Sequence, residues 1–222
     1  MQFSIDRYDE RLLEIDHWRR YPEMLPFVGT EYDAASHQKL LLIAESHYLP
    51  SSSHAHDSPA KWYQGSSADL KTKERGWINT RAIVNLGKNQ KWPSKGQTIF
   101  CRIERELLRA GLPRRENVFA HVGFLNCFLR PAGTGQSLAR TLTCLDVQKS
   151  VAAVRHVLEV LGPDRVCFLS TLAWNTVGHT VNRAGVVCEH TAHPACPWWY
   201  RASTRGNKTA REVFLAFVQG AL

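Results

Sequence analysis

Three polar stretches of the chain combine residue types that could carry out hydrolytic chemistry. In the first, a carboxylate, a hydroxyl, an imidazole and a phenol directly follow an apolar run: Glu45, Ser46, His47 and Tyr48. Asn126 ends a second apolar run, and His193 follows another one. A carboxylate can position water or offset a positive charge, an imidazole can donate to a developing oxyanion, and an amide both donates and accepts. Together these groups would form a site, whereas separately they are typical of polar turns at strand ends.

The apolar run before Glu45 predicts a strand over residues 39–46 that is buried on both faces. Its four consecutive large apolar residues, Leu40 to Ile43, are typical of the middle of a parallel sheet. Similar runs predict further strands over 118–126, 165–170 and 186–191. In open α/β sheets, ligands bind in the crevice at the carboxyl ends of the strands. The polar residues that follow the strands are therefore expected to meet at one edge of the sheet.

Apolar residues at helical spacing separate these strands. The spacing predicts helices over 5–20, 98–110, 146–161, 172–177 and 207–219. Asp146 is the expected N-cap of the third helix, and Gly162 ends it. The expected fold class is therefore α/β: a three-layer α/β/α sandwich with a central four-stranded parallel sheet and right-handed connections. We expect a single domain over 1–222 with an N-terminal helical extension at about 1–37.

The positive charge of the chain is concentrated in one segment. Residues 61–115 contain thirteen Lys or Arg and four Asp or Glu, a net charge of +9, whereas the whole chain carries +8. A localised basic segment indicates a polyanionic partner, and we expect DNA, single- or double-stranded; the alternative is a solvated basic face without a partner. The cations expected to contact the DNA backbone are Lys88, Lys91, Lys95, Arg130 and Arg201.

Three tryptophans, Trp62, Trp77 and Trp92, are interleaved with the cations of this segment. Aromatic rings next to cations can stack on bases while the cations neutralise phosphates. The same rings could form a small core beneath a long loop, and the pattern does not separate the two interpretations.

Other properties of the sequence limit the class of protein. The first 18 residues lack an apolar stretch and carry six charges before position 15, so no secretory signal is expected. No run approaches the ~20 apolar residues of a membrane span. Without a signal peptide, the six cysteines are expected to stay reduced. We therefore expect a cytoplasmic protein, a monomer, with no membrane partner.

In their order along the chain, the three polar stretches resemble the motifs of the uracil-DNA glycosylase superfamily. Residues 44–48 are similar to its first motif, Gly-Gln-Asp-Pro-Tyr-His or Gly-Glu-x-Pro-Gly, with Glu45 on the Glu of one form and Tyr48 on the Tyr of the other. Asn126 matches the Asn that ends the second strand of the family, and residues 193–195 match its His-Pro-Ser motif. The order of elements also agrees over residues 39–219, which is most of the chain.

The resemblance implies a divergent DNA glycosylase. Such an enzyme flips a uracil-like or otherwise deaminated base out of DNA and excises it by cleaving the N-glycosidic bond. The implied catalytic residues are Glu45, which would hold water beside the cationic sugar, and His193, which would donate to the base oxygen. The residues that would bind the base are Ser46, Tyr48, Asn126, Trp62 and Tyr63.

The chain departs from the family motifs at Ala44, Ser46, His47 and Ala195, and Ser46 stands where one branch has its catalytic Asp. The resemblance implies no cofactor and no metal. Branches of the family with an iron–sulfur cluster need four cysteines, including a pair near the amino terminus, and the first cysteine here is Cys101. No iron–sulfur cluster is therefore expected.

Three alternative hypotheses remain open at this point. The chain could keep the glycosylase fold and a basic groove as a non-catalytic nucleic-acid-binding protein. Ser46 could be the nucleophile of a flavodoxin-like serine esterase, although the Asp-x-x-His that this family needs does not occur. Finally, a group of closely spaced residues could bind a metal: Cys188, His190, His193 and Cys196.

Overall fold

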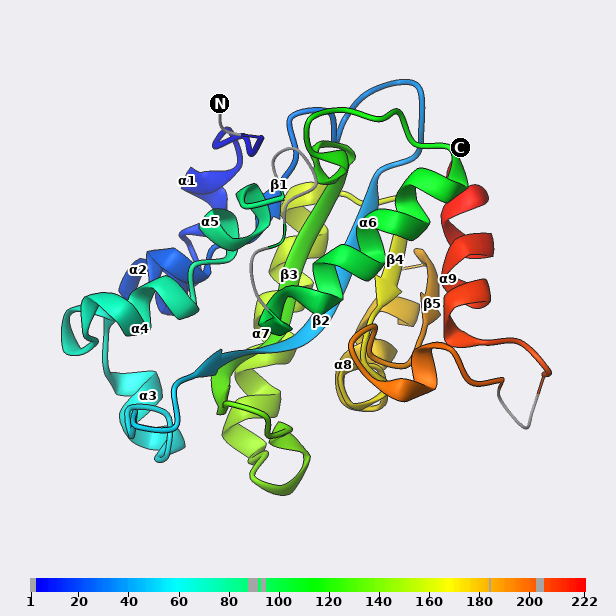
Figure 1. Cartoon of the computed structure of the whole chain (residues 1–222). Helices are drawn as coiled ribbons and strands as arrows, with labels where there is room; N and C mark the ends of the chain where they lie inside the picture. Colours follow the sequence, from blue (N-terminus) through cyan, green and yellow to red (C-terminus); the bar gives the residue numbers. More distant parts are fainter. Residues whose placement is uncertain (1–2, 88–91, 93–94, 184, 203–205) are drawn as a thin grey trace.

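The computed structural model of the chain describes residues 3–87, 92, 95–183, 185–202 and 206–222. Its centre is a five-stranded mixed sheet with the strand order β1–β3–β2–β4–β5 (Figure 1). The strands are β1 (Phe27–Val28), β2 (Leu40–Leu49), β3 (Val122–Gly133), β4 (Arg165–Phe168) and β5 (Val187–His190). Strands β2 to β5 are mutually parallel, and β1 pairs antiparallel with β3.

The fifth strand corrects the expected four-stranded parallel sheet. The four parallel strands are present, but the segment before β2 adds β1 as an antiparallel edge strand. In this pairing Phe27 lies opposite Phe124, and both rings are buried. A strand of two residues is too short to show alternation, so no pattern in the sequence predicts it.

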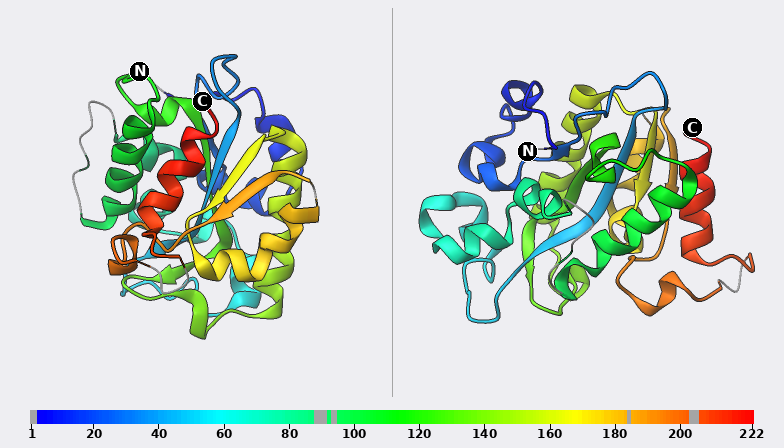
Figure 2. Two further views of the ribbon diagram at one scale, coloured as in Figure 1. Left: turned by 90° about the vertical axis from the view of Figure 1, so that its right-hand side faces the viewer. Right: turned by 45° about the horizontal axis from the view of Figure 1, so that its top comes forward.

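Helices cover both faces of the sheet (Figure 2). Helices α6 (Thr98–Ala110) and α9 (Ala210–Gln219) pack on one face, and α7 (Cys144–Leu161) and α8 (Thr171–Arg183) pack on the other. The connection from β2 to β3 through α6 crosses the sheet in one direction, and the connections through α7 and α8 cross it in the other. The helix of the first crossover lies on one face of the sheet, and the helices of the other two lie on the opposite face. Because both the direction and the face are reversed, the three crossovers have the same hand, as the right-handed rule requires.

The remaining helices are short. The α-helices are α1 (Asp9–Leu12), α2 (Asp16–Arg20), α3 (Pro59–Gln64), α4 (Thr72–Trp77) and α5 (Thr80–Asn85). The 3-10 helices are η1 (Pro22–Met24), η2 (Ser67–Asp69), η4 (Lys95–Gln97), η5 (Val118–His121), η6 (Leu138–Arg140) and η7 (Pro197–Trp199). The expected helix over 5–20 is thus two helices, because the extended backbone of Ile15 interrupts it.

The main helices lie near their predicted positions, although α8 continues to Arg183, beyond the predicted end at 177, and α9 begins at Ala210 and not at 207. Helix α6 covers 98–110 as predicted and ends at Gly111, whose φ of 111° is in the left-handed region that favours glycine. Helix α7 has Thr143 as its N-cap, not Asp146 as expected. Asp146 lies three residues further on and completes a capping box, so the carboxylate serves the same helix end from another position.

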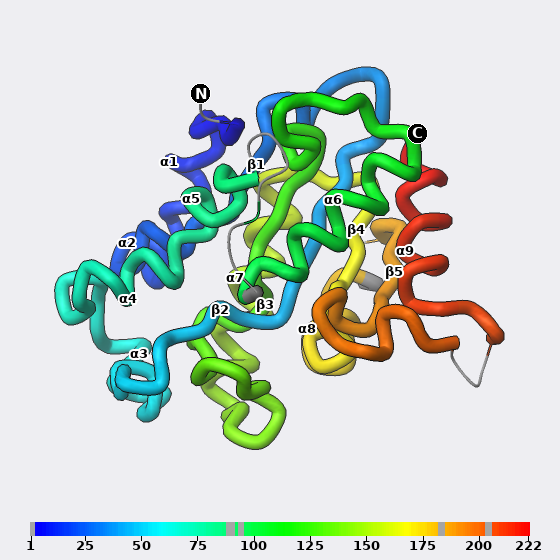
Figure 3. Tube along the Cα trace, in the orientation of Figure 1, coloured from blue at the N-terminus to red at the C-terminus, as the bar shows by residue number. Residues whose placement is uncertain are grey.

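Strand β2 supplies both faces of the core, and Figure 3 shows it passing through the middle of the molecule. Leu41 and Ile43 pack against the α7 and α8 side, and Leu40 and Leu42 pack against the α6 and α9 side. All four side chains are at most 2% exposed. Full burial of such a side chain stabilises the fold by about 1.5–3 kcal/mol, so β2 contributes strongly to the core on both faces of the sheet.

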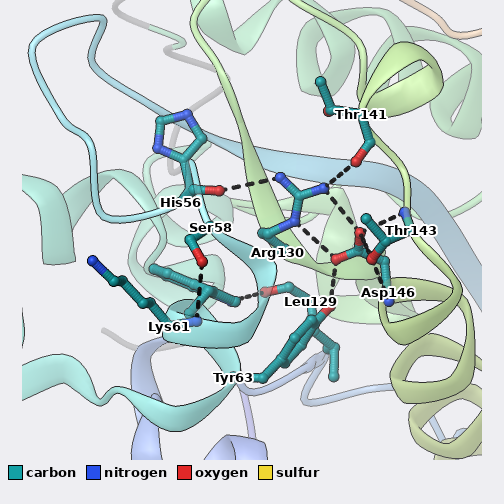
Figure 4. A network of polar contacts seen from close by, with 10 residues as sticks. His56, Ser58, Lys61, Tyr63, Leu129, Arg130, Thr141, Thr143 and Asp146 are labelled. Carbon is teal, nitrogen blue, oxygen red and sulfur yellow. Dashed lines mark hydrogen bonds and ion pairs between the residues drawn. The ribbon is translucent and has the colours of Figure 1, made fainter.

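A buried ion pair joins β3 to the start of α7 (Figure 4). Arg130 donates from Nε and Nη2 to the two carboxylate oxygens of Asp146, at 2.8 and 2.9 Å. The same guanidinium donates to the backbone carbonyls of His56 and Thr141. Burial alone would raise the pKa of Asp146, but hydrogen bonds from Arg130 and Thr143 outweigh it and lower the pKa. The pair is therefore fully ionised at neutral pH.

Tyr63 and Thr143 complete this network. The Tyr63 hydroxyl donates to Asp146 at 3.0 Å, and the Thr143 backbone N–H donates to the same carboxylate at 2.8 Å. The side chain of Arg130 is only 3% exposed and that of Asp146 is 0% exposed. This placement corrects the expectation that Arg130 contacts the DNA backbone, because its guanidinium is used inside the protein.

We expect that breaking this pair destabilises the fold far more than removing it. Arg130→Met alone, or Asp146→Leu alone, leaves one buried charge without its partner and should cost about 3–5 kcal/mol in the free energy of unfolding. The double variant, Arg130→Met with Asp146→Leu, should lose much less unfolding free energy than the sum of the two single losses, because neither charge remains buried. Urea unfolding of the three variants measures this coupling.

Glu212→Leu is the matched control, since Glu212 has the same capping-box position in α9 but is exposed and not paired with a buried Arg. It should cost much less than Asp146→Leu. Additive losses in the double variant would contradict the coupling.

Candidate functional site

The reversal in strand order lies between β2 and β4. The chain leaves β2 to form β3 on one side and later returns to form β4 on the other. Beyond the end of β4, which pairs with β2 as far as Ile43, only β2 and β3 continue as a two-stranded ribbon. The carboxyl ends of strands at such a reversal are the usual place for a ligand in an open α/β sheet. Glu45 lies two residues beyond the end of this pairing.

Two hydroxyl groups hold the carboxylate of Glu45. Ser137, in the loop after β3, donates to Oε1 at 2.8 Å, and Ser170, directly after β4, donates to Oε2 at 2.8 Å. Each serine oxygen also accepts a backbone N–H, from Ala139 and Ala173, so each hydroxyl proton is directed at Glu45. Each carboxylate oxygen retains a lone pair that can accept a proton from water.

Sequence reasoning missed Ser137 and Ser170. Both lie before a helical turn that follows a strand, which is a typical position for a serine that caps a helix. That signal predicts a bond to the backbone but not a second bond to a carboxylate more than 90 residues away in sequence. The half-buried Glu45 and these two serines are the best-defined polar group at the strand ends.

Ser46, the neighbour of Glu45 in β2, takes no part in the hydrogen bonds of this carboxylate, whose partners are Ser137 and Ser170. Ser46 is 8% exposed, and its Oγ makes no hydrogen bond to any of the residues that the structure describes. A serine nucleophile needs a hydrogen-bonded base. This arrangement therefore argues against the serine-esterase hypothesis.

His47 and Asn126 form a second polar group on the α6 and α9 side. The pairing of β2 with β3 shifts register between Ser46 and Tyr48. His47 Nε2 lies 3.1 Å from Asn126 Nδ2 and 3.1 Å from the Thr80 hydroxyl. Because an amide nitrogen only donates, Nε2 is the acceptor and His47 carries its proton on Nδ1. The amide of Asn126 is thereby oriented, with its oxygen and one N–H left for a ligand.

Burial keeps His47 neutral. Its ring is 6% exposed, and desolvation lowers its pKa from 6.5 to about 3. A neutral imidazole is required for Nε2 to accept from Asn126, so the pKa and the hydrogen bonds agree. His47 was expected only as a departure from a motif, and its role as an anchor for Asn126 was not predicted.

His193 lies in the loop after β5, and its ring proton is on the other nitrogen from that of His47. The backbone N–H of Ala195 donates to its Nδ1 at 3.2 Å, so the proton is on Nε2. Burial lowers the pKa of His193, Glu45 opposes this shift and Arg102 adds to it. Arg102, on α6, also donates to the carbonyls of Pro194 and Cys196 and holds the loop. His193 is thus a neutral imidazole whose Nε2–H has no hydrogen-bond partner among the described residues.

The three expected polar stretches come to the same end of the sheet, but as separate groups. Glu45 and His193 are close enough to influence each other electrostatically. Asn126 lies on the other side of the sheet with His47. Within the part of the chain that the structure describes, no hydrogen bond joins Glu45, Asn126 and His193 directly. A substrate or water would have to bridge them.

Two expected base-binding residues belong to the core. Trp62 is 1% exposed, stacks on Tyr21 at 4.4 Å between ring centroids and donates to the Leu129 carbonyl. Tyr63 is 9% exposed and bound to Asp146. The rings of Trp62 and Tyr63 and their N–H and O–H groups thus contact other parts of the protein. This placement corrects the expectation that the two rings stack on a base. Tyr48 remains half-buried beside Glu45, where burial raises its pKa.

The cations that were expected to contact the DNA backbone lie in different environments. Lys88 and Lys91 lie outside the described residues, and so does the side chain of Lys95. Arg130 is buried, as described above. Arg201 is exposed, and its guanidinium lies 5.3 Å from the ring centroid of the exposed Trp198.

The proposed metal ligands do not converge. Among the described residues, no group of three or more His, Cys, Asp or Glu side chains is placed to hold a metal ion. His190 instead stacks on Trp174 at 4.8 Å, and Nδ1 of His193 accepts from the backbone. The spacing of Cys188, His190, His193 and Cys196 is therefore explained by a strand end and its loop.

Comparison with known proteins gave no relative: neither the protein-family models nor the curated proteins contain a match to this chain. Within the described residues, no helix has the length and apolar character needed to span a membrane.

We expect His47 to make the fold sensitive to acid. The unfolded chain takes up a proton on this ring near pH 6.5, whereas the folded chain takes it up only near pH 3. The unfolded state therefore binds more protons between these values, and stability falls as the pH decreases below 6.5. At pH 5 the loss from His47 is about 2 kcal/mol relative to pH 7.5.

His47→Gln should reduce the difference in unfolding free energy between pH 7.5 and pH 5 by about this amount, measured by urea unfolding at both pH values. His54→Gln is the control, since the side chain of His54 is 81% exposed. An unchanged pH dependence in His47→Gln would show that the buried ring takes up its proton without unfolding the chain.

Proposed function

We propose that this protein is a divergent DNA N-glycosylase that flips a uracil-like or otherwise deaminated base out of DNA and hydrolyses its N-glycosidic bond. The observation that carries the proposal is the Glu45 carboxylate, held by two serine hydroxyls at the strand-order reversal, with the imidazole of His193 at the same end of the sheet. The order of the three motifs supports the same activity. The enzyme would act as a cytoplasmic monomer, where its free cysteines stay reduced.

The Glu45 carboxylate and the His193 imidazole suit the charges that develop in this reaction. As the bond from the sugar carbon to the base nitrogen breaks, its electron pair moves to the base, whose oxygen becomes negative, and the sugar becomes a cation. His193 Nε2–H would donate to the base oxygen, and the Glu45 carboxylate would offset the sugar cation. Water then bonds to the sugar carbon and loses a proton to Glu45. The base anion takes up a proton, leaving a free base and an abasic sugar.

The two serines would position Glu45 for this step. Each holds one carboxylate oxygen and leaves a lone pair that can accept from water. Their short side chains are fixed by bonds to the backbone, so the carboxylate needs little reorganisation during the reaction. The same bonds limit its rotation away from the sugar.

Asn126 would read the edge of the flipped base. His47 holds one N–H of its amide, which leaves a carbonyl oxygen and a second N–H for the ligand. This donor and acceptor pair complements the N–H and C=O edge that deamination creates on a base. Asn126 and Glu45 face opposite sides of the sheet. The bound nucleotide would therefore lie over the carboxyl end of β2, where it can contact both residues.

We expect the carboxylate, not the neighbouring hydroxyl, to be essential. Glu45→Gln removes the charge that offsets the sugar cation and should abolish base release. Ser46→Ala removes a hydroxyl that makes no hydrogen bond to any described residue, and it should leave at least about a tenth of the activity. The measurement is single-turnover excision from uracil-containing single strands, followed by alkaline cleavage of the abasic product.

Hydrolysis of p-nitrophenyl acetate, run in parallel, tests the esterase alternative. Turnover of the ester alone, or a dead Ser46→Ala with an active Glu45→Gln, would overturn the assignment. If the wild-type protein binds DNA but releases no base from substrates with uracil, hypoxanthine or xanthine, the non-catalytic binding protein replaces the enzyme.

Replacement of His193 tests the oxyanion donor. His193→Ala should lower the excision rate about 10²- to 10³-fold, the usual effect of removing one such donor. The thermal unfolding temperature and DNA affinity should stay close to those of wild type, because the ring accepts only one backbone N–H. A variant that unfolds instead would show that the ring has a structural role.

A further inference from the structure

A surface groove lies between α6 and the loop that carries His193. It has a volume of about 470 Å³ and is lined by Trp92, Gln97, Thr98, Cys101, Arg102, Arg105 and Tyr200. The site proposed above uses none of these residues as a reacting group. The groove is open to solvent on a side of the molecule where the chain exposes several large aromatic rings.

Two exposed aromatic rings lie in the segment that forms one wall of this groove. Tyr200, which lines the groove, is 43% exposed, and Trp198, two residues earlier in the chain, is 61% exposed, although rings of this size normally gain stability by burial. Trp199, between them in sequence, is fully buried and holds this segment to the core. Exposed rings grouped in one short segment are typical of a surface that binds a partner.

Arginines accompany each of these rings. The guanidinium of Arg102 lies 4.8 Å from the ring centroid of Tyr200, and that of Arg201 lies 5.3 Å from that of Trp198. Arg105 is exposed one helical turn beyond Arg102 and forms no ion pair with any described residue. Both carboxylates of α6 are buried: Glu104 accepts from the indole of Trp92, and Glu106 forms an ion pair with Arg109. The groove is therefore cationic as well as aromatic.

This combination selects one kind of ligand. Cations attract phosphates, and aromatic faces stack on bases, but only unpaired bases expose their faces. A duplex could use the arginines but not the rings. Arg102 also donates to the carbonyls of Pro194 and Cys196, so a residue that lines the groove is bound to the loop that carries His193.

We propose that this groove, together with the exposed Trp198 and Arg201 that flank Tyr200 in sequence, binds single-stranded DNA next to the excised base, with bases stacked on Trp198 and Tyr200 and phosphates at Arg102, Arg105 and Arg201. This inference rests on the proposed function for the identity of the nucleic acid. It narrows that function to single-stranded substrates, or to duplexes opened at the target base.

The experiment measures fluorescence anisotropy with a labelled oligonucleotide of fifteen thymidines and with a labelled duplex of the same length, neither containing uracil. Trp198→Ala and Tyr200→Ala should each weaken single-strand binding about 5- to 150-fold, the range for the loss of one stacked base. Duplex affinity should change less than about threefold, because paired bases cannot stack on these rings.

Conservative and remote variants are the controls. Tyr200→Phe keeps the ring and should keep most of the affinity. Arg105→Ala should weaken binding and reduce the salt dependence by one phosphate contact, about 0.7 in log–log slope. Arg155→Ala makes the same change of charge on α7, on the other face of the sheet, and should have little effect.

The outcomes separate this inference from the proposed function. Wild-type protein that binds the single strand through these rings but excises no base would overturn the enzyme and leave the groove. Excision by wild type, with unchanged binding in Trp198→Ala and Tyr200→Ala, would overturn the groove. Equal losses for single strand and duplex would also overturn it, as would the absence of single-strand binding at low salt.

Discussion

The bidentate ion pair between Arg130 and Asp146 determines how the loops at the carboxyl end of the sheet are arranged. It joins β3, the first turn of α7, the carbonyl of His56 and, through Tyr63, helix α3. The segment between its two residues contains Ser137, which binds the carboxylate of Glu45. A buried charge pair contributes little net stability but strongly disfavours any arrangement that separates it. The loop that carries Ser137 is thereby restricted to a narrow set of conformations.

Much of the sheet and its helices could be predicted from apolar periodicity, and the exceptions have physical reasons. Helix α6 ends at the predicted Gly111 because local backbone chemistry decides where a helix ends. Strand β2 extends to Leu49, beyond the predicted end at 46, because it continues to pair with β3, and such pairing depends on residues about 80 positions away. Strand β1 exists only because Phe27 and Val28 meet the edge of β3.

The candidate site was predicted by residue type but not by geometry. Glu45 and His193 lie where the strand ends suggested, whereas the serines that hold Glu45 have no signal beyond that of a helix cap. Trp62 and Arg130 were assigned to base and backbone binding from residue type, although for Trp62 the alternative of a core beneath a long loop was left open, and the structure supports that alternative. Their partners, Tyr21 and Asp146, are distant in sequence, and burial of this kind is visible only in the fold. Two histidines with opposite tautomers, His47 and His193, illustrate the same limit.

The central position of β2 also has a consequence for how the chain reaches this structure. Residues of β2 pair with residues of β3 that come 82 positions later, for example Leu42 with Phe124, and with those of β4 that come still later. Closing such long loops costs entropy before any contact compensates for it, which slows folding. During synthesis, β2 is made well before either of its neighbours, and its apolar residues are buried on both faces only in the finished sheet. During synthesis, the apolar side chains of β2, the strand on which the site is built, therefore stay exposed until both β3 and β4 have been made, and in this period they can aggregate.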